Sequence, residues 1–316
     1  MKFNRLVLLG LGMTCLLCLS CSKEEEKEVT PIEEPKEKDP QETTTPTIYD
    51  YNALVSQHNH LLNSYSSDGN TIYWMEYDNQ RRLTSVKGSE SYSIGSFVID
   101  YDKRTITEKD HIYHFSLNKQ GYIDTLVCDY DVLGIHMREM LAYEYDGDYL
   151  KKASFQFFEN GKPGYAGIDY NEATYQYESG LLSIVRYGGV TWEFSYGEIA
   201  NPDRLSPVSF CPLMVFFNMP TLFTIGENDM LYYTGLFGKV SDKLPDTLFY
   251  YTDYSYDIIK NNYEEYQKNK DYYDFYVNKF TFSYTTDENG IASMSTFWHN
   301  RNEWYSPFNF AFRYEK

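Results

Sequence analysis

The chain has 316 residues and a formal net charge of −18, with 46 Asp and Glu residues against 28 Lys and Arg. This excess of acid argues against nucleic-acid binding, because phosphate contacts need clustered Lys and Arg. It also disfavours direct contact with anionic lipid head groups, so we expect membrane contact only through an anchor. The 33 Tyr and 20 Phe residues favour extensive β-sheet, since aromatic rings pack well across paired strands.

The beginning of the chain has the pattern of a signal peptide. Two basic residues precede an apolar run over residues 6–19, which is too short to cross roughly 30 Å of hydrocarbon. Ser20 and Cys21 follow, and this junction resembles a lipobox, the site where bacterial lipoproteins are cut and lipidated. We therefore predict a lipoprotein signal peptide over residues 1–20 and a lipid anchor on Cys21. An ordinary cleaved secretory signal is the alternative.

Residues 21–47 are predicted to form a disordered acidic linker. The segment is rich in Pro, Thr and Glu and has almost no large apolar residues, so it cannot bury a core. Its Ser-Lys-Glu-Glu-Glu run at residues 22–26 resembles an export signal that some Gram-negative gut commensals place after the lipidated cysteine. We expect a lipid-anchored outer-membrane protein that faces the cell exterior. A periplasm-facing orientation is the alternative.

Residues 48–316 are predicted to fold as a single antiparallel β domain. Alternating aromatic residues recur, followed by Asp, Asn or Gly and then by an aliphatic residue that opens the next run. Copies of this pattern begin at Tyr73, Phe97, Tyr143, Tyr175 and Phe280. Such patterns indicate hairpins, and short turns can join only antiparallel strands. The sequence therefore predicts a meander of Tyr-rich hairpins in a large curled or barrel-like sheet.

Two segments depart from this pattern. Residues 210–223 form an apolar stretch broken by Pro212 and Pro220, and we expect a short helix or plug near residues 210–225 that packs on the sheet. Residues 257–274 are rich in Tyr, Asn, Lys and Glu with weak helical spacing, and we expect two strands of a long hairpin there in preference to a helix.

Residues 235–245 read Gly-Leu-Phe-Gly-Lys-Val-Ser-Asp-Lys-Leu-Pro. This resembles a Gly-Leu-x-Gly-Lys-x-Ser-x-x-Leu-Pro segment in a family of uncharacterised bacterial envelope lipoprotein domains with a porin-like β fold. The hairpins also resemble the Tyr-Asp repeats of Rhs-type proteins. The resemblance covers most of residues 48–316 and implies a fold, but no activity or catalytic residue. The glycines favour a structural turn, which we expect to end at Pro245 before a strand over residues 247–251.

The resemblance to a porin-like fold does not predict a pore. A barrel that faces lipid needs an apolar outer band, whereas the predicted strands and turns of this chain are acidic. We therefore expect a curled or partly closed sheet that contacts the membrane only through its anchor.

No catalytic or metal-binding constellation follows from the sequence. His58 and His60 have the spacing of two metal ligands on one strand face, but no third ligand lies nearby in the sequence. His111 and His114 form a weaker pair. Beyond the signal peptide and Cys21, only two cysteines remain, Cys128 and Cys211, and we expect two buried free thiols in preference to one disulfide. The sequence predicts no metal, no cofactor and no enzymatic activity.

Aromatic side chains are the remaining candidates for a ligand site. Exposed Tyr and Trp rings stack on the apolar faces of sugars, although packing across strands is the alternative for each ring. The candidates are Trp74, Trp192, Trp298, Trp304, Tyr263, Tyr266 and Tyr273. We expect a non-enzymatic module that binds polysaccharide or a host or envelope protein.

Two other functions stay open on the sequence alone. An envelope glycan hydrolase would need two carboxylates at a defined separation. A periplasm-facing carrier of lipid or unfolded protein would need an apolar concave face.

Overall fold

The structure is a computed structural model that describes residues 61–67, 70–89, 96–164, 172–202, 205, 233–270, 277–288, 290–300, 303–304 and 308–314. The chain divides into two units, Met1–Thr47 and Ile48–Lys316, and all described residues belong to the second. The expected lipid acceptor Cys21 and the expected plug near residues 210–225 lie outside the described residues.

The described residues are almost entirely β-strand. The first nine strands are β1 (Leu62–Ser67), β2 (Asn70–Tyr77), β3 (Leu83–Gly88), β4 (Phe97–Asp100), β5 (Thr105–Glu108), β6 (His111–Leu117), β7 (Ile123–Val132), β8 (Ile135–Asp146) and β9 (Tyr149–Glu159). The others are β10 (Lys162–Pro163), β11 (Glu172–Glu178), β12 (Leu181–Tyr187), β13 (Val190–Ala200), β14 (Lys243–Thr252), β15 (Asn278–Asp287), β16 (Gly290–Asn300), β17 (Glu303–Trp304) and β18 (Phe308–Tyr314). Two helices, α4 (Asp253–Asn261) and α5 (Tyr263–Lys268), follow β14.

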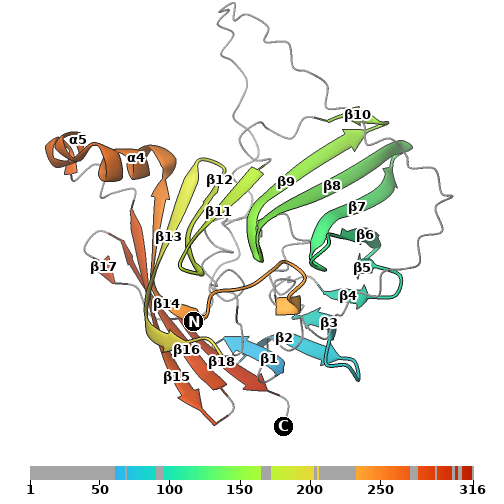
Figure 1. Ribbon diagram of the computed structural model, residues 1–316, viewed down its shortest axis with the longest axis horizontal. Coiled ribbons are helices and arrows are strands. Elements are labelled where there is room, and N and C mark those ends of the chain that lie inside the picture. Colours follow the sequence, from blue (N-terminus) through green and yellow to red (C-terminus); the bar gives the residue numbers. More distant parts are fainter. Residues whose placement is uncertain are drawn as a thin grey trace, which may run out of the picture. The chain divides into compact units, whose positions relative to one another are not determined.

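The strands form one antiparallel sheet that closes on itself (Figure 1). Sequential strands pair from β1 to β9, β11 pairs with β9, and the order then continues to β16 and β18. The ring closes where β18 pairs with β1, with Tyr65 opposite Phe312. Sixteen strands make this barrel, while the two-residue strands β10 and β17 extend their neighbouring hairpins. The predicted antiparallel meander is therefore confirmed, and the sheet is a closed barrel.

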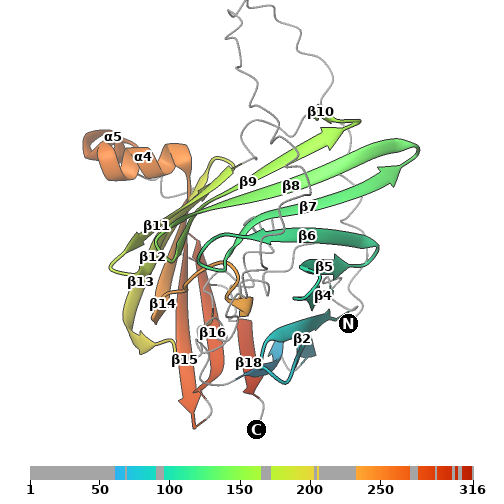
Figure 2. The same ribbon diagram turned by 45° about the vertical axis from the view of Figure 1, so that its right-hand side comes forward.

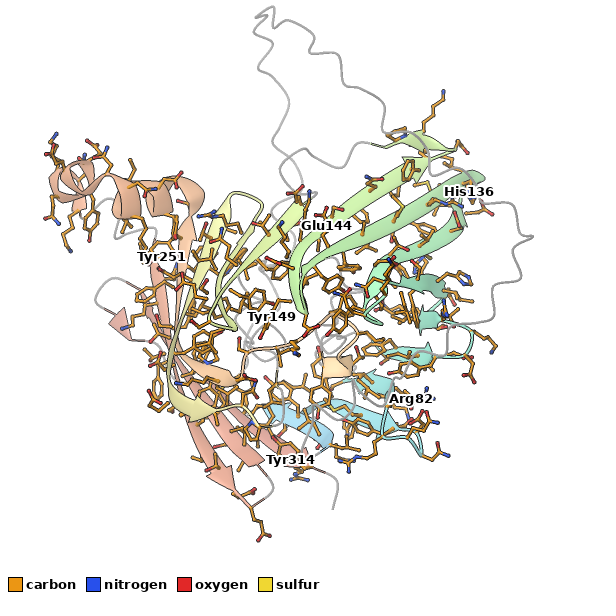
Figure 3. The ribbon with its side chains drawn as sticks, viewed as in Figure 1. Arg82, His136, Glu144, Tyr149, Tyr251 and Tyr314 are labelled. Atoms are coloured by element: carbon orange, nitrogen blue, oxygen red, sulfur yellow. The ribbon has the colours of Figure 1, made fainter. Side chains whose placement is uncertain are left out.

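Because neighbouring strands run in opposite directions, the barrel has two distinct rims. The β2–β3, β4–β5, β6–β7 and β8–β9 turns share one rim with the start of β1 and the end of β18. The β7–β8 turn lies at the opposite rim with α4 and α5, as Figure 2 shows. We call these the tyrosine rim and the helix rim. Tyr314 and His136, labelled in Figure 3, lie at the tyrosine and helix rims respectively.

A repeated tyrosine contact gives the tyrosine rim its name. In six strand pairs, a Tyr hydroxyl donates to a main-chain carbonyl near the start of the paired strand, over 2.6–3.0 Å. The contacts run from Tyr77 to Leu62, Tyr101 to Leu83, Tyr145 to Ile123, Tyr196 to Leu182, Tyr284 to Pro245 and Tyr314 to Ile291. Five of the six acceptors are Leu or Ile within the first two residues of a strand, so the contact ties a tyrosine to the start of the neighbouring strand.

The barrel interior is mainly apolar, and the outer face is mainly polar although Trp74 and Val98 are exposed on it. Along β6, Tyr113, Phe115 and Leu117 are buried while Ile112, His114 and Ser116 are exposed, which is the period-two alternation of a strand with one buried face. The outer face carries cross-strand ion pairs, including Glu76 with Lys87, Asp129 with Arg138, and Lys152 with Glu172. These outer ion pairs differ from the continuous apolar outer band of a lipid-facing barrel.

A segment between β13 and β14 packs inside the barrel at the tyrosine rim. Tyr233, Leu236 and Phe237 belong to the same buried core as the strands, and Figure 1 shows this orange segment within the ring. A sixteen-stranded barrel is too wide for its own side chains to fill, so an inserted segment closes part of the space. The sequence motif at residues 235–245 lies within this segment and the start of β14.

Main-chain and side-chain contacts hold the inserted segment to strands around the barrel. The amide of Ile123 donates to the carbonyl of Leu236 over 2.8 Å, and the amide of Lys239 donates to the carbonyl of Asp148 over 2.8 Å. Lys239 Nζ also lies 2.6 Å from Asp148 Oδ2. On the other side, the amide of Leu182 donates to Ser241 Oγ over 2.9 Å. The structural role predicted for the motif is therefore the one it has in the fold.

One predicted element is wrong, and a second is present with different bounds. The expected hairpin over residues 257–274 is replaced by α4 and α5 as far as Lys268, and residues 271–276 lie outside the described part. The helices form because Thr252 and Asn262 cap them: their side chains accept from the amides of Ser255 and Glu265. The expected strand over residues 247–251 is part of β14, which starts four residues earlier, at Lys243. Pro245 fits inside β14 because the β13–β14 register shifts there.

Candidate functional site

The aromatic residues predicted as ligand contacts do not share one site. Trp192 is 1 % exposed and belongs to the core, so its selection as a ligand contact is wrong: its ring packs inside the barrel wall. Trp74 is 44 % exposed on the outer face of β2 and remains available. Trp298 lies on β16, Trp304 on β17, and Tyr263 and Tyr266 on α5, while Tyr273 lies outside the described residues.

A different group of residues faces the barrel interior across β5 to β9. Two rows of inward side chains cross these strands in register. The row nearer the tyrosine rim is Ile106, Tyr113, Cys128, Glu139 and Phe157, and the row nearer the helix rim is Glu108, His111, Tyr130, Met137 and Glu159. Strand alternation assigns Glu139 to this face, because Leu141 and Tyr143 on the same side of β8 are buried. We call these ten residues the Glu139 wall.

The Glu139 wall is partly exposed, unlike the interior nearer the tyrosine rim. On β8, Leu141 and Tyr143 are buried, whereas Met137 and Glu139 are only half-buried. His111, Tyr130 and Phe157 are half-buried as well. On β6 to β9 the exposure of inward-facing side chains therefore increases toward the helix rim, so solvent reaches this part of the wall from that direction, whereas Glu108 on β5 is buried.

Hydrogen bonds organise the wall around the Glu139 carboxylate. Tyr130 donates its hydroxyl to Glu139 Oε1 over 2.7 Å, and Tyr113 donates to Glu139 Oε2 over 3.3 Å. The ring of His111 meets the ring of Tyr130 edge-on, with centroids 4.8 Å apart. A carboxylate, two phenol groups and an imidazole are thus held together by contacts within the wall.

The pKa values show which protonation states the wall favours. Burial, followed by the hydrogen bond to Glu139, raises the pKa of Tyr130 to about 12. Burial and the Glu139 charge also raise the pKa of Tyr113 above its usual value. The same two causes raise the pKa of the Cys128 thiol to about 11. At neutral pH both tyrosines therefore stay protonated as donors, and Cys128 is a poor nucleophile because the reactive thiolate is suppressed.

A second aromatic cluster lies on the outer face under α4. Tyr251, labelled in Figure 3, meets Tyr256 of α4 edge-on with centroids 5.4 Å apart, and its hydroxyl donates to Glu193 over 3.1 Å. Lys260 Nζ lies 2.8 Å from Glu193 and 5.9 Å from the Tyr251 ring centroid. Tyr251 and Tyr256 are both buried, so this cluster attaches the helix to the barrel and leaves little ring surface for a ligand.

The candidate metal ligands and the two cysteines can be located in the structure only in part. Among the described residues, no three His, Cys, Asp or Glu side chains are grouped to hold a metal ion. His111 and His114 point to opposite faces of β6, and His58 and His60 lie outside the described residues. Cys128 is a buried free thiol, as expected, whereas Cys211 falls beyond the part described.

The described helices also bear on membrane contact. None of them has the length and the apolar character that crossing a bilayer requires.

Comparison with known proteins gives limited information. No known family and no curated protein matches the sequence. Among solved structures, the chain is similar to a porin-like protein from Bacteroides vulgatus ATCC 8482, with a TM-score of 0.47 and 12 % sequence identity. The match covers 81 % of this chain and 99 % of that chain. At this similarity no functional argument follows, and the fold assignment depends on the strand pairing itself.

The Glu139 wall is not among the ligand contacts predicted from the sequence, which are all aromatic residues. The available signal was a carboxylate in phase with apolar residues: Glu139 shares its strand face with Leu141 and Tyr143. Acidic residues seldom occupy inward positions of a strand unless they are hydrogen-bonded there. Cross-strand register, which places Tyr113 and Tyr130 beside Glu139, could not be read from the sequence.

Proposed function

We propose that this chain is a lipid-anchored protein of the bacterial envelope that binds a glycan at the Glu139 wall without transforming it. The observation that carries the proposal is the partly exposed Glu139 carboxylate with two tyrosine donors. Carboxylate and phenol oxygens match the hydroxyl groups of a sugar, and half-buried rings match its apolar faces.

The polar outer face supports attachment through a lipid in preference to insertion of the barrel. Lys and Arg on a lipid-facing strand cost about 2–4 kcal/mol each at the bilayer midplane. Here Lys87, Arg138 and Lys152 lie on the outside of the barrel in ion pairs. An anchor at Cys21 would hold such a barrel at the membrane without placing those charges in hydrocarbon.

The composition of the wall favours glycan binding over carriage of lipid. An interior site for acyl chains would need a contiguous, accessible apolar surface. The apolar part of this interior is packed around Leu236 and Phe237, and the accessible part carries Glu139, Tyr130 and His111.

A glycan array tests the proposal and locates the site. The full-length lipidated protein, purified in detergent, is screened together with Tyr130→Leu and Trp74→Leu. We expect saccharide binding that Tyr130→Leu abolishes and Trp74→Leu leaves intact, since Trp74 lies on the outer face. Loss of binding in Trp74→Leu but not in Tyr130→Leu would place the site on the outer face. If folded protein binds no saccharide on the array, glycan binding is refuted.

A further inference from the structure

Carboxylates on the two faces of the barrel have different partners. On the outer face, Glu144 and Glu172 flank Lys152, and Asp129 is bonded to Arg138 by two hydrogen bonds of 2.8 and 3.2 Å. On the inner face, Glu139 accepts from the hydroxyls of Tyr113 and Tyr130 and forms no ion pair among the described residues. The barrel therefore holds a half-buried carboxylate whose described partners are both neutral.

The surroundings of Glu139 strengthen this asymmetry. The ten residues of the Glu139 wall include Glu108 and Glu159 and contain no Lys or Arg. Glu139 itself is half-buried, and the residues of the wall offer it hydroxyl donors but no cation. A positively charged ligand would supply the missing counter-charge.

The aromatic rings of the wall favour the same kind of ligand. The ring faces of Tyr and Phe attract cations within about 6 Å of the ring centroid, and proteins recognise ammonium ligands in this way. Tyr113, Tyr130 and Phe157 come from β6, β7 and β9, on either side of Glu139 of β8. A carboxylate flanked by rings supplies both charge and π contact to one ammonium group.

We propose that the Glu139 wall selects ligands that carry an ammonium group, with Glu139 as the counter-ion and the Tyr113, Tyr130 and Phe157 rings around it. The inference rests on the proposed glycan-binding function and names the class of saccharide: an amino sugar with a free amine. We expect Glu139 and Tyr130 to make the amino sugar bind more tightly than an N-acetylated or hydroxylated sugar of the same size.

Two oligosaccharides of equal length test the charge requirement. Full-length protein in detergent is titrated calorimetrically with a glucosamine hexamer, which is cationic, and with the N-acetylglucosamine hexamer, which is neutral. We expect the cationic hexamer to bind at least about tenfold more tightly, the size expected of one charge-assisted contact. Glu139→Gln should remove this preference while preserving the shape of the side chain.

Glu144→Gln is the matched control. It removes a charge from the same strand, but Glu144 lies on the outer face, where its side chain is 63 % exposed. General attraction to this acidic protein would weaken equally in both variants and would overturn the inference, as would failure of the cationic hexamer to bind folded wild-type protein. Equal binding of both hexamers would also overturn it while leaving the proposed function, which the array decides, in place.

Discussion

At the scale of single residues, the tyrosine hydroxyl recurs as a hydrogen-bond donor in the described part of the barrel. At the tyrosine rim it bonds main-chain carbonyls such as those of Leu62 and Leu182, and in the Glu139 wall it bonds a carboxylate. One residue type thus serves two purposes, because a phenol combines a ring that packs with a hydroxyl that donates. Phe could supply the packing at these positions but not the hydrogen bond.

Removing one rim hydroxyl should lower stability by a measurable amount. In Tyr196→Phe, the carbonyl of Leu182 loses a 2.8 Å hydrogen bond and Ser241 Oγ loses a 3.2 Å contact, while the ring stays in place. We expect the free energy of unfolding to fall by about 1 kcal/mol, the usual net value of such a bond. Urea unfolding followed by circular dichroism measures it.

The same change at a distant strand pair provides the check. Tyr77→Phe removes the bond to Leu62, and the losses in the double variant should add, since the hydrogen bonds described for the two tyrosines involve different residues. If Tyr196→Phe unfolds at the wild-type urea concentration, the rim contact contributes nothing to stability.

Alkaline pH should destabilise the fold through the tyrosines. Burial raises the pKa of both Tyr122 and Tyr130 to about 12, above the value of about 10 in an unfolded chain. Between these values the native protein holds protons that the unfolded chain has released, so the free energy of unfolding falls as pH rises. Thermal unfolding between pH 8 and 12 should show no tyrosine effect below about pH 10 and a steeper loss above it. Tyr130→Phe should reduce that slope.

At the scale of elements, the inserted segment at residues 233–242 depends on one close approach. Gly238 has φ +92°, and a Cβ there would lie 2.5 Å from the carbonyl oxygen of Asp148. Gly134 at the β7–β8 turn has a similar φ of +83°, but nothing lies within 4 Å of its Cβ position. A side chain at Gly134 would therefore meet backbone strain alone, whereas a side chain at Gly238 would meet backbone strain and a steric clash.

Gly238→Ala should destabilise the protein more than Gly134→Ala. Both substitutions place a side chain in the left-handed region at a cost of about 1 kcal/mol, and only the first also displaces the 239–148 main-chain hydrogen bond. We expect an additional loss of about 1–3 kcal/mol for Gly238→Ala in urea unfolding. Equal losses in the two variants would show that the inserted segment does not need this contact.

At this scale the sequence predicts well those elements that depend on residues close together in the chain. Hairpins such as β8–β9 follow from alternating aromatics and Asp-Gly turns, which act locally. The α4–α5 region was predicted wrongly because its Tyr content was weighed above its capping signals, Thr252 and the Asn262–Glu265 pair. The Glu139 wall depends on register across five strands, and register is a non-local property that one sequence does not reveal.

At the scale of the whole molecule, the outer surface and the anchor make a joint prediction. Cys21→Ser removes the proposed lipid acceptor and changes no residue of the barrel or of its outer ion pairs. We expect this variant to move from the detergent phase to the aqueous phase in phase-separation assays, whereas wild-type protein stays with detergent. Retention of the variant in detergent would mean that the barrel itself contacts lipid and would refute attachment through the anchor alone.

Closure of the ring has a consequence for how the protein is made. The last strand completes the barrel against the first, and Ser66 reaches the carbonyl of Ala311, 245 residues further along the chain. Contacts of such long sequence separation form late and slowly. If the chain is exported as proposed, a chain still threading through an export channel would lack β18 and could not seal the barrel. Export in an unfolded state would then be followed by folding after release, because β1 finds its partner only once β18 has emerged.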